Sequence, residues 1–143
     1  SAHFMRIVNR HYHHFLAFRS KPWVSTAHFR KTLETMIEDI GSKRPNARIA
    51  FVRIADAGGR YREKVKGVQQ SIRMYNSVLE EVVQNHRNEH LKVVMLDPYV
   101  GESIEALLLP DGHHLTEKGH RCVAQSVRKF LVDEAVSSDT RNL

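Results

Sequence analysis

Asp111 and His114, three residues apart, are the pair in this sequence best suited to acid–base chemistry. A histidine acts as a general base near neutral pH when one ring nitrogen faces the substrate and an acceptor holds the other. Asp111 can be that acceptor if the backbone turns between the two residues, and Gly112 makes such a turn easy. His113 is less well placed to pair with Asp111, because the side chains of close neighbours diverge. The spacing therefore predicts an acid–base dyad on a tight turn.

Hydrophobic periodicity predicts the scaffold that must position this dyad. Two nearly continuous apolar runs are typical of strands covered on both faces, and the segments around them have helical spacing. This alternation favours an α/β fold, a three-layer α/β/α arrangement with a parallel sheet. Ligands gather at the carboxyl ends of such strands, and the loops after Ala55 and Leu96 and the dyad turn can all reach that edge. The expected elements are helices at about 25–42 (ended by Gly41), 65–86, 101–108 and 116–135, strands at 48–55 and 91–96, and a loop at 56–62.

The dyad and its surroundings resemble the C-terminal part of the SGNH hydrolases, the GDSL-type esterases and lipases. In that family an Asp-x-x-His motif before the last helix supplies the acid and the base of a Ser-His-Asp triad, which here would be Asp111 and His114. The resemblance covers roughly residues 25–135, and its specific motif is confined to residues 110–120. It implies a flavodoxin-like parallel sheet that lacks the first strand or strands, and hydrolysis of ester or other acyl bonds.

The sequence departs from the family pattern at the nucleophile. The family's serine lies in a Gly-Asp-Ser motif, which does not occur here. The family's oxyanion asparagine follows a strand in a Gly-x-Asn-Asp pattern, and the matching residue is Asn9, with Ile7 and Arg10 at the glycine and aspartate positions. Three alternatives stay open: a serine on a segment or partner chain outside this sequence, a water activated by His114, or a domain without hydrolytic activity.

The excess positive charge lies in the first quarter of the chain. Residues 1–33 contain six basic residues and no acidic one, whereas 16 basic and 16 acidic residues follow. Aromatic side chains are interleaved there, a pattern that can hold phosphates and stack bases. The segment therefore predicts binding of RNA or another anionic partner, against the alternative of a basic loop packed on the domain. The cations concerned are Arg6, Arg10, Arg19, Lys21, Arg30 and Lys31.

The rest of the sequence limits the class of protein. Its length fits one domain over residues 1–143, with a basic segment at 1–33, an α/β core at 34–136 and a frayed tail at 137–143. No cofactor is expected, and the two histidine clusters lack the ligands of a structural zinc site, so no metal is expected either. No apolar run reaches the length of a membrane span. The lone Cys122 fits an intracellular compartment, cytoplasmic or organellar.

Two functions remain in competition. One is an SGNH-like hydrolase of small acyl or ester substrates, with Asp111 and His114 as its dyad. The other is a catalytically inactive SGNH-like subunit of a larger, RNA-containing assembly, bound through residues 1–33. Whether the chain is an enzyme depends on a nucleophile that this sequence does not identify.

Overall fold

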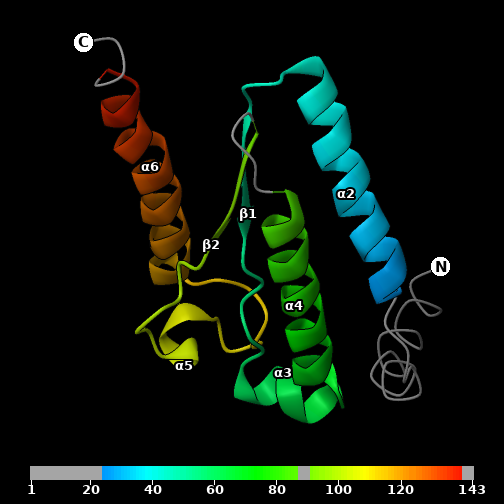
Figure 1. Cartoon of the computed structure of the whole chain (residues 1–143). Coiled ribbons are helices and arrows are strands. Elements are labelled where there is room, and N and C mark those ends of the chain that lie inside the picture. The colour runs from blue at the N-terminus through cyan, green and yellow to red at the C-terminus, as the bar shows by residue number, and fades with distance from the viewer. Residues whose placement is uncertain (1–23, 87–90, 140–143) are drawn as a thin grey trace, which may run out of the picture.

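Two parallel strands lie at the centre of the molecule, with helices on both sides (Figure 1). The computed structural model describes residues 24–86 and 91–139. The predicted α/β class with a parallel sheet is confirmed. Within the described residues the elements are α2 (Thr26–Lys43), β1 (Arg48–Val52), α3 (Gly59–Lys64), α4 (Val68–His86), β2 (Lys92–Leu96), α5 (Ile104–Leu107) and α6 (Glu117–Asp139).

The strands β1 and β2 pair in parallel over their full length. Arg48 lies opposite Lys92 and Val52 lies opposite Leu96. Both strands therefore end at the same edge, where α3 and α5 lie (Figure 1). The connection from β1 to β2 runs through α4, as expected for a parallel pair, which needs a crossover rather than a hairpin.

The main core lies between the sheet and the α2–α4 layer. Apolar side chains at helical spacing on α2 and α4 meet alternate residues of the strands. Ile37, Val82 and Val93 are almost completely buried there, and burial of such a side chain stabilises the fold by about 1.5–3 kcal/mol. The core consists of Leu33, Ile37, Ile49, Val78, Leu79, Val82, Leu91 and Val93.

The helix α6 covers the opposite face of the sheet (Figure 1). Its contact with β1 includes the Arg48 guanidinium, which lies 4.5 Å from the centre of the Phe130 ring. Among the described residues, Val127 and Leu131 of this helix remain exposed. In the described part of the chain, no helix is both long and apolar enough to cross a membrane.

The structure corrects three expectations about the helices. The helix α2 does not end at Gly41 but continues to Lys43, with the side chain of Leu91 packed closely against Gly41. The expected loop at 56–62 contains the start of α3. The expected helix at 65–86 begins only at Val68, because Gly67 adopts a positive φ of 79° and separates α3 from α4.

Candidate functional site

The predicted dyad lies on a closed turn between α5 and α6. The Leu109 N–H donates to the His114 carbonyl at 2.8 Å, and the Gly112 N–H donates to the Leu109 carbonyl at 2.9 Å. Leu108 and Leu115 form an antiparallel bridge at the base of the turn. Because Leu108 is buried, it anchors this base in the protein. The turn is therefore fixed by its own backbone and by one buried side chain.

The side chains of Asp111 and His114 are joined by a hydrogen bond. The distance from His114 Nδ1 to Asp111 Oδ2 is 2.8 Å. The other carboxylate oxygen, Oδ1, accepts the backbone N–H groups of His113 at 3.0 Å and His114 at 3.1 Å. The carboxylate is thus held on both oxygens, and it can hold the imidazole in one orientation.

The same contacts keep Asp111 ionised. The His113 N–H, then the His114 imidazole and the His114 N–H, stabilise the charged carboxylate and lower the pKa of Asp111 well below its ordinary value of 3.8. An ionised Asp111 can only accept hydrogen bonds, so Nδ1 of His114 must carry a proton. The second nitrogen, Nε2, is then free to accept a proton. Among the described residues the His114 side chain is 66% exposed, which leaves it accessible to solvent.

The loop after β1 is hydrogen-bonded to the dyad turn. The Gly58 N–H donates to the Gly112 carbonyl at 2.9 Å. A Cβ atom on Gly58 would lie 2.9 Å from the Gly112 Cα, so the two backbones touch at a point that only glycine fits. A pocket of about 300 Å³ lies at this junction, lined by Gly58, Arg60, Leu108 and Gly112 among others. A pocket thus lies beside the dyad turn, at the carboxyl edge of the sheet.

The helix α3 contacts the dyad turn from the other side. The ring of Tyr61 lies 4.8 Å from the ring of His113, and the His113 and His114 rings are 4.1 Å apart. This aromatic stack supports the turn at its exposed face. Sequence reasoning missed both α3 and the contact of His113, although Gly58-Gly59 was a signal of a close backbone approach.

Thr116 connects the turn to α6. Its hydroxyl accepts the Gly119 N–H at 3.1 Å, which caps the helix, and donates to the Ala106 carbonyl at 2.9 Å. A Cβ atom on Gly119 would lie 2.5 Å from the Leu107 carbonyl oxygen. The start of α6 is therefore packed tightly against α5, and the dyad lies between two fixed elements.

Ion pairs and a buried amide hold the carboxyl ends of the strands together. The Arg53 guanidinium, just after β1, lies 2.7 Å from Glu80 of α4 and 3.1 Å from Asp97, just after β2. Asn76 is buried and pairs with both backbone groups of Ile54, at 2.9 and 3.0 Å. These contacts build the edge that carries the site.

The other predicted binding residues fall into two groups. Arg6, Asn9, Arg10, Arg19 and Lys21 lie outside the described residues. Of the described pair, Arg30 forms an ion pair with Glu81, and Lys31 is exposed on α2.

A divalent cation could find ligands at the dyad turn. Asp111, His113 and His114 each offer one ligand atom, and these atoms lie within 4.8 Å of one another. All three residues are exposed, and a structural zinc site would need a fourth ligand. A cation bound here would compete with the hydrogen bond of the dyad, because both use Asp111 and His114.

Solved structures support the fold. The chain superimposes with a TM-score of 0.64 on a mutant acetyl esterase crystallised with acetate ion, at 16% identity over 80% of this chain and 52% of that one. A carbohydrate esterase family 3 protein from Talaromyces cellulolyticus gives a TM-score of 0.62 and 17% identity, over 77% and 50%. The α/β fold is thus similar to that of these two esterases, and the chain spans about half the length of the two structures. No family model and no curated protein matches the sequence.

Proposed function

We propose that this chain supplies the acid–base half of an ester hydrolase that releases short acyl groups such as acetyl. The observation that carries the proposal is the 2.8 Å contact between His114 Nδ1 and Asp111 Oδ2 on an exposed turn. Its support from the fold is the similarity to an acetyl esterase and a carbohydrate esterase. The pocket at Gly58 and Gly112 would receive the substrate.

In the proposed reaction, His114 transfers the proton and Asp111 orients the His114 imidazole. Nε2 of His114 accepts the proton of a nucleophilic hydroxyl as its oxygen bonds to the acyl carbon. The ester bond then breaks, and Nε2 returns the proton to the leaving alcohol. With a serine nucleophile, a water repeats both steps on the acyl-enzyme; with a water nucleophile, the acid forms directly. The serine would come from a segment or partner chain outside this sequence.

Asn9 would contribute to this site as an oxyanion donor. Its side-chain amide would donate to the oxygen that becomes negative as the tetrahedral intermediate forms, which is worth about 2.7–4 kcal/mol where it has been measured in another hydrolase. This role rests on the resemblance of the sequence around Asn9 to the family pattern.

The test is hydrolysis of an acetyl ester by the full chain and by variants of the dyad. We expect His114→Gln to lower kcat/KM by about 10²–10⁴-fold, the usual contribution of a general base. Asp111→Asn should also slow the reaction, since an amide no longer selects the Nδ1–H tautomer. His120→Gln is the matched control, because His120 is an exposed histidine of α6 outside the dyad. Equal activity of His114→Gln and the unmodified chain would refute the proposal.

A fluorophosphonate probe separates the two nucleophiles. Labelling that depends on His114 supports a serine, whereas hydrolysis without labelling supports an activated water. A folded chain with no hydrolysis and salt-sensitive RNA binding would instead favour the alternative function, an inactive subunit bound through residues 1–33.

A further inference from the structure

A second pocket lies at the elbow between α3 and α4, and its charged lining is entirely positive. Its volume is about 310 Å³, close to the lower limit for small-molecule sites. Arg62 of α3 and Arg73 of α4 line it, together with the glutamines Gln69 and Gln70, and its lining includes no carboxylate. We refer to it as the elbow pocket.

Within the described part of the chain, the two guanidinium groups of the elbow pocket form no ion pair. Among the described residues, the hydrogen bonds and ion pairs include none from the side chains of Arg62 or Arg73, whereas Arg53 and Arg121 pair with carboxylates. Arg62 has only a longer-range electrostatic effect on Glu105, whose carboxylate accepts a hydrogen bond from the Ser103 hydroxyl at 2.9 Å. Two cations that share a pocket favour a bound anion, since it offsets their mutual repulsion.

The surrounding segment strengthens this preference. Residues 60–73 contain five basic residues and one acidic one, a net charge of +4. The Gln69 side-chain amide donates to Asp56 at 3.2 Å, which fixes its position at the wall of the pocket. Glutamine amides and guanidinium forks together offer several N–H donors, the groups that an oxyanion accepts.

The elbow pocket lies close to the dyad along the short helix α3. Tyr61, whose ring stacks on His113, directly precedes Arg62. Arg60, one residue earlier, lines the pocket beside Gly112. The two pockets are thus lined by residues two positions apart on α3, so a substrate that contacts both must extend around the helix.

We propose that the elbow pocket binds a phosphate- or sulfate-type oxyanion carried by the substrate, so that the chain acts on acyl esters of anionic alcohols such as phosphorylated sugars. The statement about the substrate rests on the proposed hydrolase function, whereas binding of the oxyanion does not. Guanidinium groups suit this ligand because their planar donors match two oxyanion oxygens at once.

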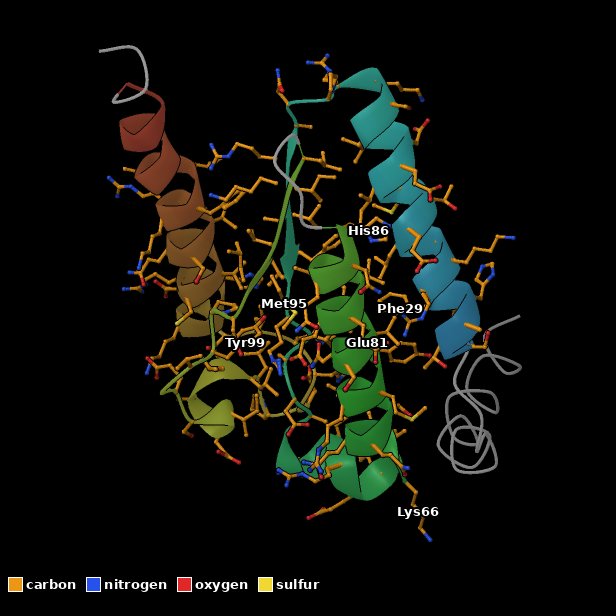
Figure 2. The ribbon with its side chains drawn as sticks, viewed as in Figure 1. Phe29, Lys66, Glu81, His86, Met95 and Tyr99 are labelled. Atoms are coloured by element: carbon orange, nitrogen blue, oxygen red, sulfur yellow. The ribbon has the colours of Figure 1, made fainter. Side chains whose placement is uncertain are left out.

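The first test measures binding of inorganic pyrophosphate to the full chain by calorimetry or by amide chemical shifts. We expect Arg62→Gln and Arg73→Gln each to weaken binding by at least about tenfold, as expected for the loss of a charge-assisted hydrogen bond. Lys66→Gln is the control, because Lys66 belongs to the same basic segment but points away from the molecule (Figure 2). Its effect should stay within about twofold, through the general field alone.

Three results would overturn the proposal that the elbow pocket binds an oxyanion. They are no binding of pyrophosphate, an affinity that is unchanged in both arginine variants, or an equal loss of affinity in Lys66→Gln. A different outcome is that an RNA oligonucleotide binds more tightly than pyrophosphate, with the same dependence on Arg62 and Arg73. That result would overturn the proposal of a small substrate and identify the ligand of the pocket as a polyanion. Circular dichroism of each variant shows that the exposed substitutions leave the fold intact.

The second test connects the elbow pocket to catalysis. With a pair of acetylated sugars that differ only in a phosphate group, Arg62→Gln should raise KM at least about tenfold for the phosphorylated ester alone. Its kcat and its KM for the neutral ester should not change. His114→Gln should lower kcat/KM for both esters by about 10²–10⁴-fold and leave pyrophosphate binding intact. Failure of the hydrolase proposal and failure of the oxyanion-binding proposal therefore give different results.

Discussion

Substitution of Gly112 by alanine tests whether the dyad turn depends on a backbone that only glycine allows. Gly112 has a φ of 81°, and a Cβ atom there would lie 3.0 Å from the backbone N of Tyr61 and 3.1 Å from the Gly58 carbonyl oxygen. The left-handed backbone costs about 1–2 kcal/mol for an L-residue. The close contacts with backbone atoms add about 1–3 kcal/mol, as in other overpacked sites. We therefore expect Gly112→Ala to lower the free energy of unfolding by roughly 2–5 kcal/mol.

Substitutions of two other glycines separate the cost of the left-handed backbone from the cost of the close contacts. Gly67 also has a positive φ, 79°, but a Cβ atom there would meet nothing within 4 Å, so Gly67→Ala should cost only the backbone contribution of about 1–2 kcal/mol. Gly59 is helical and has no neighbour within 4 Å, so Gly59→Ala should stabilise the protein by up to about 1 kcal/mol. Urea denaturation followed by far-ultraviolet circular dichroism measures all three. If Gly112→Ala costs no more than Gly67→Ala, the turn is not packed against α3 as described.

Three further predictions concern the dyad and the edge of the sheet. The pKa of Asp111 is lowered in the folded chain, so its contribution to stability is present above pH 3.8 and is lost as the pH falls below that value; Asp111→Asn should flatten the pH dependence of urea unfolding in that range. Zinc should bind at the dyad turn and slow ester hydrolysis, with recovery on chelation, and His113→Ala should weaken zinc binding by about tenfold, measured by calorimetry. Asn76→Ala should lower the unfolding free energy by about 1–3 kcal/mol, because it removes two hydrogen bonds to the backbone of Ile54, and an unchanged urea midpoint would contradict this.

Local signals in the sequence predicted local structure well. Ser25 accepts the His28 N–H at 3.2 Å, and Thr116 caps α6, both as a hydroxyl before an apolar helical run suggests. The expectation at Gly41 was wrong because helix propensity is only a weak preference, and packing of Leu91 against that glycine outweighs it. The α/β class followed from periodicity, which depends on burial over many residues.

Contacts between distant segments could not be predicted in the same way. Gly58 and Gly112 touch across 54 positions of sequence, and nothing in either neighbourhood specifies the other. The same holds for Arg53, whose partners lie on α4 and after β2. The Asp111–His114 contact was predictable because the two residues are only three positions apart and Gly112 allows the backbone to turn between them. The two pockets on either side of α3 were not predictable, because they depend on how α3 packs against the dyad turn and α4.

The short helix α3 connects the features of the site. Successive residues of a helix are rotated by about 100°, so three consecutive side chains point in three directions. Arg60 accordingly lines the pocket beside Gly112, Tyr61 stacks on His113, and Arg62 lines the elbow pocket. An extended segment would alternate between only two faces and could not serve all three neighbours. The helical turn that begins at Gly59, expected as a loop, therefore connects the dyad turn to both pockets.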